Sequence, residues 1–188
     1  MRIVLIGMSG SGKSTFGRFI ANLMELPFID TDEEICKKYG EISAIFSSAG
    51  EKTFRAFEEQ EGLLASTYEN CVVATGGGMV LNENAMKALK KGGLIVYLYC
   101  DAEFLYQRLK DDATARPLLS GDDKKQKIEE MLKKRGELYL NYSNIVLNEG
   151  GILQSRNLLD SEPEIQLGAL YLEFLKAFEK RVYSKYSG

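Results

Sequence analysis

The sequence predicts an α/β protein built on a parallel β-sheet. Short apolar runs alternate along the chain with segments of helical periodicity, which is the order of parallel strands joined by helices. The first run, Ile3–Ile6, is continuously apolar, as expected of a strand buried on both faces. Glycine-rich or acidic residues follow several runs, at the carboxyl ends of the strands, where such sheets bind ligands.

Five apolar runs are predicted to be the strands of this sheet. Each is short and ends at polar residues or glycine, which is typical of strands in an α/β protein. The predicted strands span residues 1–6, 27–30, 71–74, 93–99 and 144–147.

The segments between these runs are predicted to be helical from their periodicity and their caps. Asp32 and Asp101 are suited to cap the helices that follow them, and Gly50 is predicted to break a longer helical stretch. The last helix carries its apolar side chains on one face. The predicted helices cover residues 13–24, from 32, 42–47, 51–68, 82–91, from 101, 125–140 and 164–184.

Two segments are predicted to be irregular. Residues 148–163 read as a loop, and residues 110–125 are charged and polar, with too little apolar surface to pack firmly. We therefore expect residues 110–125 to be a mobile lid. No linker, repeat or low-complexity segment divides the chain, so we expect residues 1–188 to form one domain.

Composition excludes several classes of function. The chain has no histidine, which excludes Ser-His-Asp and Cys-His catalysis and histidine zinc sites. A general base is therefore expected to be a carboxylate. The net charge of −3 argues against a general nucleic-acid-binding protein. The scattered cysteines, the lack of a long apolar run and a strand at the very start predict a cytoplasmic protein without a signal peptide or membrane partner.

The strongest motif is Gly7–Ser14, which fits G-x-x-x-x-G-K-[ST], the phosphate-binding loop of nucleotide-using proteins. Glycines let the backbone approach phosphate closely, and Lys13 can reach the β- and γ-phosphates. The Ser14 hydroxyl can ligate Mg²⁺. A chance glycine-rich turn is the alternative, but the strand, loop and helix stand in the required order. The predicted nucleotide-binding residues of this segment are Gly10, Ser11, Gly12, Lys13, Ser14 and Thr15.

Acidic residues and glycines at two further strand ends are candidates for the same site. Asp30 is suited to act on Mg²⁺ directly or through water, and its alternative is a turn acid. Asp32 is either only a helix cap, or also a proton acceptor or a ligand of a substrate hydroxyl. Gly76–Gly78 are either a flexible turn or backbone lying close to a ligand.

Three arginines are candidates for binding anions. Arg135 is in register with the apolar stripe of its helix, so it points inward and needs an anionic partner, either an acid of this chain or a ligand. Arg55 is spaced to pair with Glu51 and Glu58, which allows simple surface ion pairs. Arg116 lies in the polar segment, where it is either solvated or able to reach phosphate from a closing flap.

Taken in order, these motifs resemble those of the shikimate kinases from Arg2 to about Leu147. After Leu147, the sequence does not align with a motif of this family. The matching motifs are the phosphate loop, F-x-D-x-D at 28–32, G-E-x-x-F-R-x-x-E at 50–58, G-G-G-x-V at 76–80, R-P-L-L at 116–119 and R-x-x-x-Y at 135–139.

The resemblance implies a three-layer α/β/α P-loop kinase fold with a five-stranded sheet in the order 2-3-1-4-5 and a mobile lid. It also implies transfer of the γ-phosphoryl group of ATP, with Mg²⁺, to the 3-hydroxyl of shikimate in aromatic amino-acid biosynthesis. The alternatives are another small-metabolite kinase, such as a gluconate kinase, and a non-catalytic ligand-sensing domain. We expect a monomer.

The resemblance further implies roles for particular residues. Asp32 orients the hydroxyl and accepts its proton, while Lys13 and Arg116 stabilise charge on the phosphoryl group. Ser14 and Asp30 hold Mg²⁺. The position of Arg108 lies beside adenine. The implied shikimate-binding residues are Asp32, Arg55, Gly77, Gly78 and Arg135.

Overall fold

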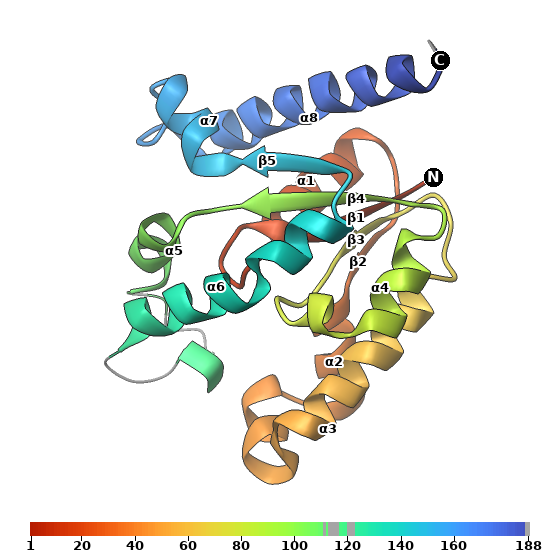
Figure 1. Ribbon diagram of the computed structural model, residues 1–188, viewed down its shortest axis with the longest axis vertical. Helices are drawn as coiled ribbons and strands as arrows, with labels where there is room; N and C mark the ends of the chain where they lie inside the picture. Colours follow the sequence, from red (N-terminus) through yellow and green to blue (C-terminus); the bar gives the residue numbers. More distant parts are fainter. Residues whose placement is uncertain (111, 113–116, 120–122, 187–188) are drawn as a thin grey trace.

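The computed structural model describes residues 1–110, 112, 117–119 and 123–186, and its strands form one five-stranded sheet in the order β2-β3-β1-β4-β5 (Figure 1). All four neighbouring pairs are parallel. This arrangement confirms the predicted α/β class and the strand order implied by the resemblance. The strands are β1 (Arg2–Ile6), β2 (Phe28–Asp30), β3 (Val72–Ala74), β4 (Gly93–Tyr99) and β5 (Ile145–Asn148).

The central strand β1 is buried on both faces, so helices cover the sheet on both sides. Val4 and Ile6 lie in one hydrophobic cluster and Ile3 and Leu5 in another, because successive side chains of a strand point to opposite faces. The result is the expected three-layer fold. The first cluster includes side chains of α3 (Ile42–Ala65), α4 (Glu83–Lys90), α5 (Ala102–Leu109) and α6 (Lys124–Tyr142), and the second those of α1 (Lys13–Leu23) and α8 (Pro163–Tyr186).

Helix α2 (Thr31–Tyr39) packs on the first half of α3 around a small separate core. Ile35, Ile45 and Phe54 are its buried side chains. Inside α3, Gly50 has φ 78° and ψ 170°, a conformation that side chains disfavour and that is not helical. This confirms the predicted break at Gly50, although the two helical pieces follow one another directly.

Asp30, and not Asp32, caps α2. The Asp30 carboxylate accepts hydrogen bonds from the backbone N–H of Asp32 at 3.0 Å and of Glu33 at 3.4 Å. The prediction that Asp32 is the cap is therefore wrong, because the helix already begins at Thr31. The Asp32 carboxylate is therefore not needed to accept hydrogen bonds from the backbone at the start of the helix. The predicted cap at Asp101 is confirmed by its hydrogen bond from the Phe104 N–H at 2.8 Å.

The predicted loop over residues 148–163 is also partly wrong, because it contains helix α7 (Glu149–Ser155). Its two glycines lower the intrinsic helix propensity, but tertiary contacts outweigh them. The Asn148 side chain caps the helix by accepting a hydrogen bond from the Gly151 N–H at 3.0 Å. Leu153 is buried and anchors the helix to the protein.

Of the predicted lid, the structure describes residues 110, 112, 117–119 and 123–125. Pro117–Leu119 form a short 3₁₀ turn, η2, and Leu119 is buried in the first hydrophobic cluster. Arg116 lies outside the described residues, and lid mobility stays a prediction. In the part of the chain that the structure describes, no helix combines the length and apolar character needed to cross a bilayer.

Arg2 ties the carboxyl-terminal ends of two helices to the sheet. Its buried guanidinium donates hydrogen bonds to the carbonyls of Ser66 and Tyr68, just beyond α3. It also donates to the carbonyls of Leu89, at 3.2 Å, and Lys91, at 3.0 Å, at the end of α4. The last carbonyls of a helix lack partners within the helix, and their partial negative charge favours a cation.

We expect Arg2→Met to lower the free energy of unfolding by about 2–4 kcal/mol. Hydrogen bonds to a charged group contribute about 1.5–3 kcal/mol each, and several carbonyls lose their donor. Urea unfolding measures the change. Arg18→Met, which removes the exposed ion pair with Glu33, is the control and should cost about 1 kcal/mol or less. Equal losses in the two variants would contradict the role given to Arg2.

Candidate active site

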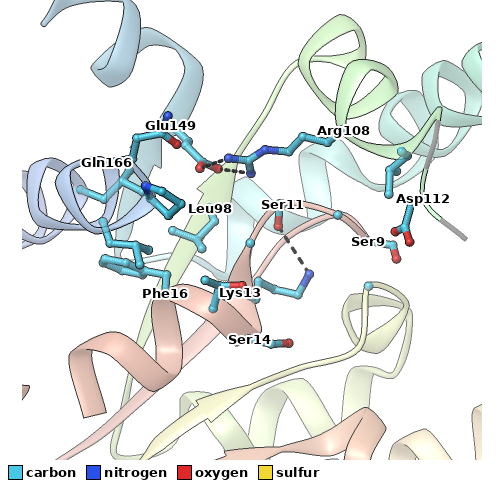
Figure 2. A pocket seen from close by; sticks show the side chains of 18 of the residues that line it. Ser9, Ser11, Lys13, Ser14, Phe16, Leu98, Arg108, Asp112, Glu149 and Gln166 are labelled. Atoms are coloured by element: carbon cyan, nitrogen blue, oxygen red, sulfur yellow. Dashed lines mark hydrogen bonds and ion pairs between the residues drawn. The ribbon is translucent and has the colours of Figure 1, made fainter. Parts of the chain in front are cut away.

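The loop between β1 and α1 has the backbone that a phosphate-binding loop requires. Gly10 and Gly12 have φ values of 85° and 77°, which favour glycine. Lys13 is largely buried, and its Nζ donates to the Met8 carbonyl at 2.7 Å and to Ser11 Oγ at 3.4 Å. The ammonium group therefore lies against its own loop, as Figure 2 shows.

This loop lines a cavity of about 530 Å³ at the carboxyl ends of the strands (Figure 2). Arg108 of α5 and Glu149 of α7 line it as well, and α8 adds the apolar side chains Leu167 and Leu170. A cavity with a glycine-rich, N–H-bearing wall and an apolar wall suits a nucleoside phosphate. It is lined by every predicted nucleotide-binding residue that the structure describes, namely Gly10, Ser11, Gly12, Lys13, Ser14, Thr15 and Arg108.

A second cavity, of about 250 Å³, adjoins the first. Its lining combines apolar side chains, among them Phe46, Phe54 and Met131, with charged ones, namely Asp32, Arg55, Glu58 and Arg135. Asp32 lines both cavities, as do Ser9 and Gly77. The two cavities therefore meet at the Asp32 carboxylate. The second one is lined by all five residues that the resemblance assigns to the substrate, namely Asp32, Arg55, Gly77, Gly78 and Arg135.

Two of the three glycines after β3, Gly76 and Gly78, lie against charged side chains of the site. A Cβ atom on Gly78 would lie 1.8 Å from Arg55 Nη1, and one on Gly76 would lie 2.5 Å from Asp32 Oδ1 and 2.6 Å from a Glu58 carboxylate oxygen. The Gly76 amide donates to Thr31 Oγ1 at 3.0 Å. At Gly76 and Gly78, charged groups therefore occupy the space that a side chain would need.

Asp32 and Glu58 each keep one buried carboxylate oxygen that accepts no hydrogen bond from the residues that the structure describes. Burial raises the pKa of Asp32 to about 7, and the neighbouring charges of Glu58 and Asp30 act in the same direction. Lys13 and Arg55 oppose this shift. Burial also raises the pKa of Glu58, against the opposite effect of Arg55 and Arg135. Asp32 is thus a carboxylate with raised basicity at the junction of the cavities.

Arg55 and Arg135 differ in how they are held. Arg55 donates to Glu58 at 2.6 Å and to Glu51 at 2.9 Å. Because Glu58 is 0% exposed, the reading of Arg55 as part of surface ion pairs is wrong for this partner. Arg135 is 6% exposed, as predicted from its place in the apolar stripe, and donates to the Gly77 carbonyl at 3.1 Å. No carboxylate among the described residues forms an ion pair with Arg135, and its Nε has no partner there.

Ser14, the last residue of the phosphate loop motif, lies next to Asp30. The Ser14 hydroxyl donates to Asp30 Oδ2 at 2.5 Å. A hydroxyl and a carboxylate are the oxygen ligands that Mg²⁺ prefers, and Mg²⁺ commonly takes its remaining ligands from phosphate and water. Within the described residues, no group of three or more acidic or cysteine side chains is placed to hold a metal by itself. The pair fits a magnesium ion that arrives with a phosphate ligand.

Two residues at the site escape the sequence reasoning. Glu149 is 4% exposed and accepts hydrogen bonds from both terminal nitrogens of Arg108, at 2.9 and 2.5 Å. Glu149 directly follows the end of β5. Because ligands of parallel sheets bind at the carboxyl ends of the strands, this position could have identified it as a candidate site residue. Ser9 occupies a variable position of the phosphate loop, where the motif carries no signal.

Comparisons with known proteins agree with this geometry. The shikimate kinase family model matches residues 9–160. A shikimate kinase of Caldicellulosiruptor bescii is 46% identical over 140 residues, which cover 74% of this chain and 81% of the relative.

Two solved structures are also similar. The shikimate kinase of Acinetobacter baumannii in complex with shikimate has 36% identity and a TM-score of 0.75, over 78% of this chain and 82% of the other. The shikimate kinase of Bacteroides thetaiotaomicron has 27% identity and a TM-score of 0.81, over 95% and 98% of the two chains. With a family match over most of its length and a relative of this identity, the chain belongs to the shikimate kinase family.

Proposed function

We propose that this chain, acting as a single domain, transfers the γ-phosphoryl group of ATP to the 3-hydroxyl of shikimate in aromatic amino-acid biosynthesis. The observation that carries the proposal is the meeting of two cavities at Asp32, one beside the phosphate loop and one beside two arginines. Membership of the family supports it, and so does the Acinetobacter baumannii relative solved with shikimate.

In the proposed reaction, the larger cavity holds ATP with its phosphates on the loop. The Lys13 ammonium, now bonded to Met8 and Ser11, turns to the β- and γ-phosphates when these arrive. Arg116 contributes further positive charge. Ser14 and Asp30 would hold Mg²⁺, which when bound neutralises phosphate charge. Catalysis of this kind rests on positioning and electrostatics more than on covalent chemistry.

The smaller cavity holds shikimate with its hydroxyl at the junction. The free oxygen of Asp32 accepts a hydrogen bond from the 3-hydroxyl and takes its proton as the oxygen–phosphorus bond forms. The bond between the γ-phosphorus and the bridging oxygen breaks, and ADP leaves. The raised pKa of Asp32 makes its carboxylate a better proton acceptor at neutral pH.

The substrate carboxylate binds between Arg55 and Arg135. Arg55 is held in place by Glu58, while Arg135 has no acidic partner among the described residues. A buried guanidinium is costly unless an anion meets it, and a carboxylate matches its planar fork. The apolar side chains that also line the cavity suit the carbon ring. This combination of arginines and apolar side chains favours a small cyclic or branched hydroxy acid.

The proposed function is tested by following ADP release with shikimate, with gluconate and without an acceptor. We expect turnover that depends on shikimate, because the smaller cavity offers arginines for a carboxylate and apolar side chains for a carbon ring. Turnover with gluconate alone would assign the chain to another small-metabolite kinase. Nucleotide binding without turnover on either acceptor would indicate a ligand sensor.

We expect Asp32→Asn to lower kcat by about 10²–10⁴-fold, the usual contribution of a positioned base. Asparagine keeps the size of the side chain but cannot accept the proton. Steady-state kinetics measure the loss, and thermal unfolding checks that the fold is retained. Glu33→Gln, on the exposed side of the same helical turn, is the control and should leave kcat unchanged. A loss under about threefold in Asp32→Asn would refute the base role.

We expect Arg135→Ala to weaken shikimate binding by about ten- to a hundredfold, because a hydrogen bond to a charged group contributes about 1.5–3 kcal/mol. ATP affinity should change much less. Separate titrations of the two ligands into wild type and variant make the comparison. Equal losses for both ligands would show that Arg135 is structural, and no loss for either would show that it is satisfied within the protein.

A further inference from the structure

The carboxylate of Glu149 is buried in the wall of the larger cavity, and the proposed reaction gives it no task. Oε1 accepts from Arg108 Nη2 at 2.5 Å, and Oε2 accepts from Arg108 Nη1 at 2.9 Å (Figure 2). Oε2 also accepts a hydrogen bond from the Cys100 thiol at 3.3 Å. Both oxygens are therefore engaged, and the contact with the guanidinium is bidentate.

The position of this carboxylate is fixed by the elements around it. Glu149 is the first residue of α7, whose start is capped by Asn148 and whose far side is anchored by buried Leu153. Cys100 follows the end of β4. Burial, together with the charge of Glu149, raises the pKa of the Cys100 thiol, which therefore stays protonated and able to donate. Glu149 has little freedom to move.

Glu149 in turn fixes Arg108. The guanidinium lies over the Phe104 ring, with its central carbon 4.5 Å from the ring centroid. A Cβ atom on Gly12 would lie 3.5 Å from Arg108 Nη1, so the group stands directly beside the phosphate loop. The side chain is 33% exposed, and it lines the cavity. Much of the rotamer entropy that an arginine loses on binding a ligand is thus already lost in the free protein.

The charge of Arg108 is compensated by Glu149, which distinguishes it from an arginine that binds phosphate. A guanidinium in a bidentate pair with a buried carboxylate has both terminal nitrogens occupied along one edge, while its flat face stays able to stack on a planar ring. The apolar residues Leu167 and Leu170 of α8 line the same cavity. These surroundings suit the adenine that the resemblance places beside Arg108.

We propose that Glu149 is a positioning residue for the nucleotide: it holds the Arg108 guanidinium as a rigid platform on which the nucleobase stacks, and it keeps the charge of Arg108 away from the phosphates. This inference rests on the proposed function in taking a nucleoside phosphate as the ligand of the larger cavity. It gives the segment after β5, which begins with Glu149, a role in nucleotide binding.

Calorimetric titration with ADP and with inorganic tripolyphosphate tests the proposal, in the absence of Mg²⁺ and shikimate. In Glu149→Gln the platform loses its charged partner, and we expect ADP to bind about 5- to 20-fold more weakly, because Arg108 must then be ordered on binding. Tripolyphosphate, which lacks a base, should not bind more weakly. Glu173→Gln removes the Arg156–Glu173 ion pair, which lines neither cavity, and should leave both affinities unchanged.

A double-mutant cycle separates positioning from general support of the fold. In an Arg108→Ala background, Glu149→Gln should weaken ADP binding no further, because the platform is already absent. Equal weakening of ADP and tripolyphosphate, unchanged ADP affinity in Glu149→Gln, or full additivity in the cycle would each overturn the proposal.

A second variant covers the case in which Glu149→Gln does not fold. Arg108→Lys keeps the positive charge but lacks the plane, so it should weaken ADP and spare tripolyphosphate; unchanged ADP affinity would overturn the proposal. If wild type and variants bind ADP as expected but wild type does not phosphorylate shikimate, only the proposed function fails.

Discussion

The ion pair between Glu58 and Arg55 is the interaction on which the acceptor side of the site depends. A carboxylate with no exposure to solvent has to be compensated, and the Arg55 nitrogen at 2.6 Å does this. The same pair keeps the Arg55 guanidinium beside the backbone of Gly78. Arg135 also acts on Glu58 electrostatically but forms no ion pair with a described residue. Arg55 is thus paired with Glu58 and with Glu51, while Arg135 stays without an acidic partner among the described residues and is the cation best placed to meet an anionic substrate.

The sequence predicts the parts of this structure that rest on local patterns. The phosphate loop, the break at Gly50 and the inward direction of Arg135 all follow from spacing or from the conformational needs of glycine. The cap of α2 differs from its prediction by two residues, because two acids at neighbouring positions both suit a helix start. This small difference matters for the site. Because Asp30 caps the helix, the Asp32 side chain is able to line the two cavities.

The features that sequence reasoning misses depend on contacts between distant segments. Helix α7 looks like a loop because of its glycines, and only packing around Leu153 and the Glu149 pair with Arg108 explains it. The sequence likewise places three glycines after β3 without indicating which groups they make room for. Those groups come from α2, α3 and the phosphate loop, so their approach emerges only when the sheet assembles.

The three consecutive glycines after β3, Gly76–Gly78, also limit which substitutions this protein can accept. A side chain at Gly76 or Gly78 would collide with the carboxylate or guanidinium groups beside it, and at Gly77 a Cβ atom would lie 2.9 Å from the Ser9 amide nitrogen. A substitution there therefore disturbs the site itself. An inhibitor that draws its affinity from these peptide groups would contact a surface that single mutations cannot reshape without loss of the enzyme's own geometry. Resistance would then have to arise at other lining residues, such as Phe46 and Met131.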